Sequence, residues 1–321
     1  MAFFLVTGGC GFIGSHLVDA LLSGGHRVRV LDDLSTGNPA YLPSSATLLV
    51  GDVRDPEIVG RALEGVDGCF HLAAVVAVTR CEKRWEHAHQ VNLTGALNVF
   101  RQATGRRKAI PVVYASSAAV YGDAREIPAH EETAVQPINA YGADKAACEL
   151  HAGAIARATG ASLTGLRFFN VYGPRQDPTS IYSGVVSIFC ERLMKGELVD
   201  IYGDGRQTRD FIHVSDVVRA LLNAMQAPHD GGRVYNVCTG KTLSISALAK
   251  SVAKLCGTRP EMRFLPAREG DIQHSLGDPS RAAAELNFRA RVSVNAGLGE
   301  LIALFRASGN SEAQPEKIAA R

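Results

Sequence analysis

Short apolar runs alternate along the chain with longer segments in which apolar residues recur every three or four positions. The short runs, rich in Val, Leu, Ile and Phe, have the length of buried strands, whereas the longer segments have the periodicity of amphipathic helices. The pattern predicts strands at 2–7, 26–32, 46–52, 68–74, 110–117 and 162–168, and helices at 12–24, 56–64, 82–104 and 140–159. This alternation is typical of an α/β protein with a doubly wound parallel sheet covered by helices on both faces.

The alternation stops after residue 168, which predicts a second structural unit. The elements expected there are a loop at 169–180, a helix at 184–195, a strand at 198–203 and a return to the sheet at about 210–237. The predicted division is a main domain at 1–168 plus about 210–237, a smaller discontinuous C-terminal lobe at about 169–209 and 238–306, and a flexible tail at 307–321. The tail is expected because apolar periodicity ends after Phe305.

Composition excludes several classes of partner. The 34 Lys and Arg are balanced by 32 Asp and Glu, so no basic face for nucleic acid or an anionic membrane is expected. The N-terminus lacks a charged leader, and no apolar run reaches the roughly 18 residues of a membrane span. Seven cysteines without a C-x-x-C pair indicate reduced thiols, and no ligand cluster indicates a metal site. We expect a cytoplasmic protein without membrane or metal.

The first chemical signal is the segment "VTGGCGFIGSH", which follows the first strand and opens a helix. Glycines there permit a tight turn and let backbone amides approach a pyrophosphate at the positive end of the helix. The context of strand, turn and helix favours a Rossmann-type dinucleotide site over an ordinary glycine-rich turn. The expected contacts of this loop are Gly8, Gly11, Phe12, Ile13 and Gly14.

Two carboxylates end the second predicted strand, at Asp32 and Asp33. A carboxylate about 20 residues after the glycine loop accepts hydrogen bonds from a ribose 2′-hydroxyl. Because like charges repel, two carboxylates disfavour a 2′-phosphate in the same pocket. The sequence therefore predicts NAD rather than NADP as cofactor.

The second chemical signal combines a strand end with a helix start. Ser116 and Ser117 stand where an apolar run stops, which by itself indicates no more than a polar strand end before a turn. Further along, Tyr141 and Lys145 lie one helical turn apart on the same face. An ammonium near a phenol lowers the phenol's pKa, as does the positive nicotinamide ring of NAD⁺, so Tyr141 is predicted to act as a general base near neutral pH.

Five motifs together resemble the extended short-chain dehydrogenase/reductase family: "TGGCGFIG", "HLAA", "ASSAAVYG", "YGADK" and "RFFNVYGPR". The resemblance covers residues 3 to about 305. It implies a catalytic triad of Ser117, Tyr141 and Lys145, in which Ser117 holds the reacting sugar hydroxyl. It also implies a homodimer formed by the helices predicted at 82–104 and 140–159. Further NAD contacts implied by the family are Asp52, Val53, Leu72, Ala73, Ala74, Asn92, Ala115, Tyr141, Lys145 and Phe168.

Residues missing from this chain narrow the reaction that the resemblance implies. Dehydratases of the family carry an Asp and Glu pair after the catalytic hydroxyl, and decarboxylases a glutamate, where this chain has Ala118 and Ala119. What remains is oxidation at one carbinol and return of the hydride to the opposite face, which is a 4-epimerase. A UDP-glucuronate 4-epimerase, a dehydrogenase or dehydratase, and a non-catalytic NAD-binding sensor stay open as alternatives.

The C-terminal lobe carries segments that resemble the nucleotide-binding segments of UDP-galactose 4-epimerases, at 203–216 and 266–271. The residues thereby implied to bind a UDP-sugar are Ser117, Asn170, Tyr202, Arg209, Arg268, Asp271 and Ser275. Arg209 and Arg268 are expected on the diphosphate and Asp271 on a ribose hydroxyl. Ser275 stands where a gate residue faces C2 of the sugar, and a small residue there predicts entry of N-acetylated sugars. A register shifted by one residue would make His274 the gate. Two departures from many relatives, Asp33 for Asn and Val76 for Lys, bear on how firmly NAD is retained.

Overall fold

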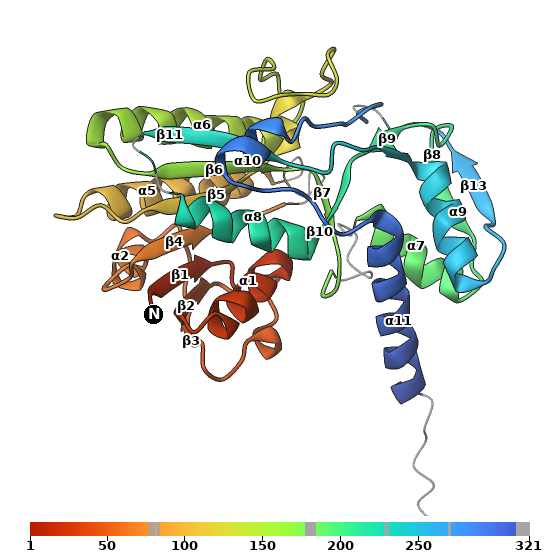
Figure 1. Ribbon diagram of the computed structural model, residues 1–321, viewed down its shortest axis with the longest axis horizontal. Helices are drawn as coiled ribbons and strands as arrows, with labels where there is room; N and C mark the ends of the chain where they lie inside the picture. Colours follow the sequence, from red (N-terminus) through yellow and green to blue (C-terminus); the bar gives the residue numbers. More distant parts are fainter. Residues whose placement is uncertain are drawn as a thin grey trace, which may run out of the picture.

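The computed structural model describes residues 1–76, 81, 84–176, 184–227, 229, 231–268 and 271–312. Its centre is a seven-stranded sheet in which every pair of neighbours is parallel. The strands are β1 (Phe3–Thr7), β2 (Arg27–Asp32), β3 (Thr47–Val50), β4 (Gly68–His71), β5 (Val112–Ser117), β6 (Leu163–Phe168) and β11 (Gly232–Val237). They lie in the order β11-β6-β5-β4-β1-β2-β3, which confirms the predicted doubly wound, Rossmann-type α/β fold (Figure 1).

Helices cover both faces of the sheet and form one apolar core on each. On one face α1 (Phe12–Ser23) and α8 (Val214–Gln226) pack together, joined by α10 (Ser280–Glu285). On the other face lie α2 (Pro56–Ala62), α5 (Gly95–Thr104) and α6 (Ala140–Thr159). The core side chains on the two faces are fully buried, as the near-continuous apolar strands require of a sheet covered on both sides.

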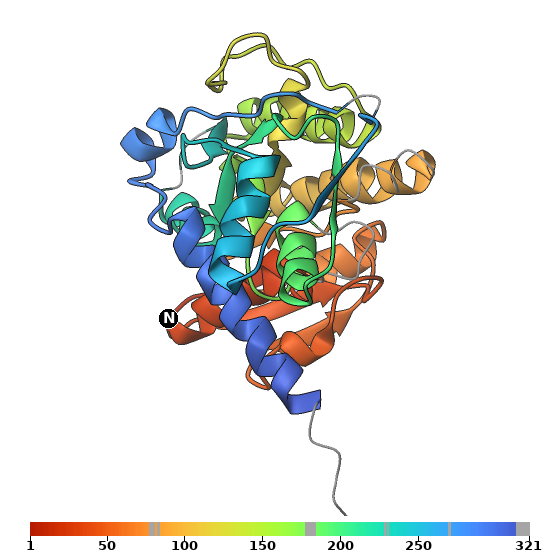
Figure 2. The ribbon, with the colours of Figure 1, turned by 90° about the vertical axis from the view of Figure 1, so that its right-hand side faces the viewer.

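A third apolar core holds the smaller lobe, in which α7 (Val185–Met194), α9 (Ile245–Cys256) and α11 (Val294–Glu312) pack on one another (Figure 2). Three two-stranded sheets complete it: β7 (Asn170–Tyr172) with β10 (Phe211–His213), β8 (Val199–Tyr202) with β13 (Met262–Leu265), and β9 (Thr208–Arg209) with β12 (Leu243–Ser244). The chain crosses into this lobe after β6 and returns to the main sheet with α8 and then β11. The domain boundaries themselves stay a prediction.

The structure differs from two expectations about helices. The helix expected at 82–104 consists of α4 (Trp85–His89), a π-helical segment (Gln90–Thr94) and α5, while residues 82–83 lie outside the described part. Helix α11 continues through Glu312, so 307–312 are helical where a tail was expected, and 313–321 are not described. Apolar periodicity marks the face that packs, whereas each added residue of a helix gains a backbone hydrogen bond without it.

Two short 3₁₀ helices complete the described elements, at Pro39–Tyr41 and Ala118–Tyr121. None of the seven cysteines, all of which the structure describes, forms a disulfide, and six of them are buried. Among the described residues, no helix is both long and apolar enough to cross a membrane.

Candidate active site

The predicted cofactor residues gather at the carboxyl ends of neighbouring strands. In the strand order, β1 lies between β2 and β4, so successive strands are added on opposite sides of β1. This topological switch point leaves a crevice at the carboxyl ends of β1 and β4, where dinucleotides bind in such sheets. The glycine loop follows β1, and the "HLAA" segment continues from β4.

The glycine loop has the close backbone approach that a pyrophosphate site needs. Gly8 adopts a φ of +70°, and a Cβ built on it would lie 2.7 Å from the amide nitrogen of Ala73. A Cβ on Gly14 would lie 2.1 Å from the carbonyl oxygen of Gly8. Gly11 is the N-cap of α1 and offers no side chain to the first amides of the helix. These amides therefore remain available to an anionic group, which fits the pyrophosphate of NAD.

Asp32 lies buried at the end of β2, beside this loop. Its carboxylate accepts hydrogen bonds from the amides of Cys10 and Leu34, each at 2.9 Å. Burial raises the pKa of Asp32, and these two hydrogen bonds oppose the rise. Asp33 is exposed and accepts from the amide and hydroxyl of Ser35, so of the two carboxylates only Asp32 is buried beside the glycine loop.

Three further predicted cofactor residues lie after β3 and in the π-helical segment. After β3, Asp52 pairs with Arg54, whose Nε donates to Oδ2 at 2.8 Å, and Val53 is buried. Asn92 lies in the π-helical segment and is 1% exposed. Its side chain accepts from the amide of Val75 at 2.8 Å and donates to the carbonyl of Val75 at 3.0 Å. Asn92 thus fixes the backbone at Val75, after the end of β4. The π-helical turn, which has one extra residue, presents the Asn92 side chain to this backbone.

The Ser, Tyr and Lys side chains meet where α6 begins against the end of β5. Ser117 is the N-cap of a 3₁₀ helix, and its Oγ accepts from the amide of Ala119 at 3.1 Å. Asn139 caps α6 by accepting from Gly142, which places Tyr141 in the first turn. Lys145 is buried, and its Nζ lies 5.8 Å from the centre of the Tyr141 ring.

Burial raises the pKa of Tyr141 to about 12, and a hydrogen bond with the Ser117 side chain opposes that rise. Burial also lowers the pKa of Lys145. The expectation that Tyr141 acts as a base near neutral pH includes the positive charge of bound NAD⁺, so it stays a prediction. The helical spacing of Tyr141 and Lys145 was visible in the sequence, whereas the removal of both groups from water depends on the whole fold.

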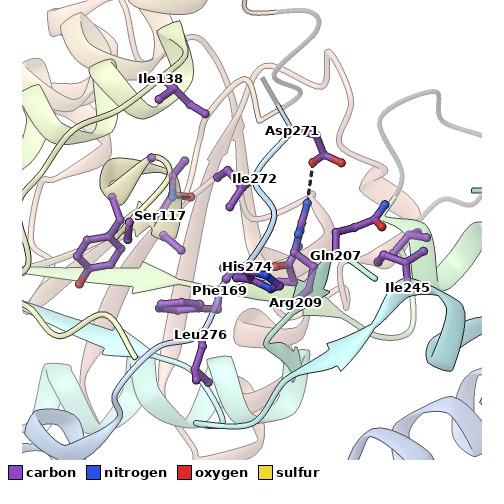
Figure 3. A pocket seen from close by; sticks show the side chains of 18 of the residues that line it. Ser117, Ile138, Phe169, Gln207, Arg209, Ile245, Asp271, Ile272, His274 and Leu276 are labelled. Carbon is purple, nitrogen blue, oxygen red and sulfur yellow. Dashed lines mark hydrogen bonds and ion pairs between the residues drawn. The ribbon is translucent and has the colours of Figure 1, made fainter. Parts of the chain in front are cut away.

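A cavity of about 550 Å³ extends from Ser117 and Tyr141 into the smaller lobe (Figure 3). Its lining includes all seven residues implied to bind substrate: Ser117, Asn170, Tyr202, Arg209, Arg268, Asp271 and Ser275. Tyr141 and Phe168 also line it. The structure therefore brings together residues from both lobes that are up to 158 positions apart in the chain, from Ser117 to Ser275.

The far end of the cavity carries its two cationic side chains. Arg209 Nη2 donates to Asp271 Oδ1 at 2.6 Å, which the dashed line in Figure 3 marks. The guanidinium of Arg268 lies over the Tyr202 ring, 3.7 Å from its centre. Arg209, expected on the diphosphate, is thus paired with Asp271, expected on the ribose. Arg268 stacks on an aromatic face.

Further lining residues were missed by the sequence reasoning, namely Ile138, Asn139, Phe169, Gln207, Ile245, Ile272 and Leu276. Phe169 lies in the motif "RFFNVYGPR" and Gln207 in the segment 203–216, so the residues around them could have indicated a place in the site. Ile245 begins α9, and nothing near it in the sequence indicated a site. His274 lines the cavity together with Ser275, and its Nδ1 lies 3.0 Å from Thr208 Oγ1.

The fold and this arrangement define an NAD-dependent enzyme of the extended short-chain dehydrogenase/reductase type. Residues 4–238 match the NAD dependent epimerase/dehydratase family, and the chain belongs to that family. It is an isomerase with NAD as its cofactor.

Relatives agree over nearly the whole chain. It is 37% identical to the UDP-glucose 4-epimerase of Mycolicibacterium smegmatis, over 94% of this chain and 98% of the relative. Its structure is similar to that of the UDP-glucose 4-epimerase of Thermotoga maritima with UDP-glucose, with a TM-score of 0.91, 35% identity, and coverage of 95% and 99%. It is also similar to a UDP-N-acetylglucosamine 4-epimerase of Methanobrevibacter ruminantium in complex with UDP-N-acetylmuramic acid, with a TM-score of 0.90, 33% identity, and coverage of 96% and 99%.

Proposed function

We propose that this protein is a UDP-hexose 4-epimerase that interconverts UDP-glucose with UDP-galactose, and UDP-GlcNAc with UDP-GalNAc, through a 4-keto intermediate. The observation that carries the proposal is the single cavity that joins Ser117 and Tyr141 at one end to Arg209 and Arg268 at the other. A neutral sugar beside the first pair and a diphosphate beside the second pair match this distribution of charge. The relatives with UDP-sugars support the same assignment.

Tyr141 is the proposed general base, and Ser117 the group that holds the reacting 4-hydroxyl. NAD, held by the glycine loop and Asp32, would supply the acceptor and donor for the hydride of C4. Tyr141 takes the 4-hydroxyl proton as C4 is oxidised and gives it back as the carbonyl is reduced, so protons and hydride balance over one cycle. Between the two steps the 4-keto sugar presents its opposite face. Lys145 supplies positive charge near the phenol and favours its ionised form.

The nucleotide end is proposed to bind UDP through side chains of the smaller lobe. Arg209 is held by Asp271, so its guanidinium is oriented before the ligand arrives and loses little freedom on binding. Arg268 presents a planar fork that suits phosphate oxygens. Asp271 lies beside Arg209 at the nucleotide end of the cavity, where its carboxylate can accept a hydrogen bond from a ribose hydroxyl.

The sugar end favours epimerisation of a neutral hexose. From Ser117 onward, the lining side chains up to residue 124 are Ala118, Ala119, Tyr121 and Ala124, and Gly122 adds backbone. None of these is acidic, so no second acid and base stand ready to remove water from the sugar. None is cationic either, which leaves the carboxylate of a uronic acid without a charged partner there. Ser275 lines the same cavity, and its short side chain is compatible with an N-acetyl group there.

A homodimer is part of the proposal. Helices α6 and α4 expose Leu150, at 74%, and Trp85, at 56%, and large exposed apolar side chains on neighbouring helices suit a partner helix face. Sedimentation equilibrium of the wild type against Leu150→Glu tests this. A monomeric wild type would contradict it.

The test of function is incubation of the purified full chain, without added NAD, with UDP-galactose and separately with UDP-GalNAc. Inversion at C4 is followed by NMR. We expect both sugars to invert. No added NAD should be needed, because NAD stays bound through turnover. Inversion of UDP-galactose alone would refute entry of the N-acetylated pair, and inversion of neither would refute the UDP-hexose assignment. The matched control is Tyr141→Phe, which keeps the cavity and removes the proposed base.

A further inference from the structure

A buried ion pair lies between the helix that carries Tyr141 and the sheet. Arg167 on β6 donates from Nε to Glu149 Oε1 at 2.9 Å and from Nη2 to Oε2 at 2.7 Å. The two side chains are 4% and 8% exposed. A buried ion pair adds little net stability, because the loss of hydration offsets the attraction between the charges. Stability alone therefore does not account for it.

The pair belongs to a larger set of hydrogen bonds, which we call the Glu149–Arg167 network: Ser116, Tyr121, Glu149, Arg167 and Asn236. Ser116 Oγ donates to Glu149 Oε1 at 2.5 Å. Arg167 Nη1 donates to the Tyr121 hydroxyl at 2.8 Å, and that hydroxyl donates to Asn236 Oδ1 at 2.7 Å. Tyr121 itself lines the cavity. A polar network satisfied to this extent makes its surroundings rigid.

The members of the network adjoin the proposed catalytic residues in the chain. Ser116 directly precedes Ser117, and it lies opposite Arg167 in the β5–β6 register. Glu149 follows Lys145 by four residues, so both lie on the same face of α6. The network therefore connects that face of the helix to the strand end that presents the Ser117 hydroxyl.

We propose that Glu149 and Arg167 are positioning residues, whose ion pair fixes α6 against β5 and β6 and so holds the Tyr141 phenol at the Ser117 hydroxyl. The roles of Tyr141 and Ser117 in this statement rest on the proposed function. Misplacement of a reacting group by about 1 Å costs on the order of 10²-fold in rate, so a fixed helix position matters to the proton transfer.

The test replaces both charges, Glu149→Leu with Arg167→Met, because removal of one alone would leave a buried unpaired charge. We expect NAD content and UDP affinity to match the wild type. The kcat should fall at least about tenfold with little change in KM, since the phenol is misplaced for chemistry rather than for binding. The rising limb of kcat with pH should move to higher pH, because the phenol loses the Ser117 hydrogen bond that favours its ionisation.

A matched control is available in the ion pair between Arg233 and Glu285, whose Nη1 and Oε2 are 2.6 Å apart. It joins β11 to α10, its side chains are 50% and 40% exposed, and it does not line the cavity in the described part of the chain. Glu285→Leu with Arg233→Met should leave kcat and its pH limb unchanged. A general effect of lost ion pairs on turnover would appear in both double variants.

A folded Glu149→Leu, Arg167→Met variant with wild-type kcat and pH limb would overturn the proposal. Where that variant does not fold, Arg167→Lys decides, because lysine keeps the positive charge beside Glu149 but loses the paired donation from Nε and Nη2; an unchanged kcat and pH limb there overturns the proposal equally. Failure of the proposed function would be recognised separately, because the wild type itself would then invert no UDP-hexose. In that event the test uses the near-ultraviolet absorbance of the Tyr141 phenolate, measured as the difference from the matching Tyr141→Phe protein. This absorbance reports the surroundings of the phenol without turnover. Equal titration midpoints in wild type and variant overturn the proposal.

Discussion

The ammonium of Lys145 donates a hydrogen bond to the carbonyl oxygen of Ala115 at 2.9 Å. Ala115 lies on β5 two residues before Ser117, and Lys145 lies on α6 one turn after Tyr141. The bond therefore fixes the charged group 5.8 Å from the centre of the Tyr141 ring, where a positive charge favours the phenolate.

Replacement of Tyr141 by phenylalanine should lower kcat by roughly 10² to 10⁴, the contribution expected of a general base. UDP binding should stay at the wild-type level, because Arg209 and Arg268 lie at the other end of the cavity. Steady-state kinetics and calorimetry with UDP measure the two quantities. Turnover close to wild type in this variant would rule out Tyr141 as the base.

Replacement of Ser117 by alanine should move the rising limb of kcat to higher pH. The hydrogen bond with Ser117 opposes the effect of burial, which raises the pKa of Tyr141 to about 12 in the protein alone. Without that bond the pKa of the phenol rises further, and a base is active only above its pKa, so the limb follows it upward. A pH–rate profile of the variant checks the direction, and a limb that stays in place or moves down contradicts it. The neighbouring Ser116 hydroxyl donates to Glu149 instead, so the hydrogen bond that acts directly on the pKa of Tyr141 is the one with Ser117.

Arg209→Ala should weaken the binding of UDP by about 2 to 5 kcal/mol, the usual cost of removing one partner of a buried charge pair. The side chain of Arg209 is 15% exposed, so a phosphate beside it would be largely shielded from water. Lys241→Ala is the control, because Lys241 is an exposed cation of the same lobe that lies outside the cavity lining. Calorimetry with UDP should separate the two variants, and equal affinities would place Arg209 away from the diphosphate.

Much of this site was predictable because its chemistry lies at strand ends that local patterns mark. The glycine loop needs only the strand and helix on either side of it, and the bounds expected for α6, 140–159, agree with the structure. The convergence of Arg209, Asp271 and Ser275 came from the family resemblance rather than from periodicity. Their common cavity confirms that they lie together, and their individual roles stay predictions.

The rest depended on contacts between segments far apart in the chain. Arg167 stands in an apolar strand, and the sequence does not reveal that Glu149 of helix α6 pairs with it. The π-helical turn at Asn92 needs a bond to Val75, which precedes it by 17 residues. Desolvation of Tyr141 is likewise a property of the assembled lobes. Helical or strand spacing gives the face on which a residue lies, whereas its partners come from the tertiary fold.

His71 should make the protein less stable in acid. Burial, with a smaller contribution from Lys145, lowers the pKa of His71 to about 3, and its Nδ1 shares a hydrogen bond with Thr7 Oγ1 at 2.8 Å. An unfolded histidine ionises near about 6.5, so between these values the unfolded state binds a proton that the folded state does not. Stability is therefore lost as pH falls through this window, by up to about 1.4 kcal/mol per pH unit from this group.

Urea unfolding of the wild type and His71→Gln at several pH values between 7 and 4 measures that loss. The variant should start less stable at pH 7 and lose less on acidification. His130→Gln, at an exposed histidine, is the control and should follow the wild type. Parallel pH dependence in wild type and His71→Gln would show that His71 does not govern the acid limb.

Ser275→Tyr should abolish turnover of UDP-GlcNAc and UDP-GalNAc while sparing the plain hexoses. Ser275 lines the cavity, and its amide donates to the carbonyl of Thr208 at 3.1 Å, which fixes the backbone from which the larger side chain would project. A tyrosine there would fill the space that the N-acetyl group needs. In the wild type, discrimination between the two pairs should amount to only about 1 to 3 kcal/mol, since shape alone rarely gives more. His274→Tyr is the matched control, because it places the same side chain one residue earlier. Selective loss of the N-acetylated pair in His274→Tyr rather than in Ser275→Tyr would assign the gate to His274, and equal loss of both pairs in Ser275→Tyr would show that Ser275 does not face C2.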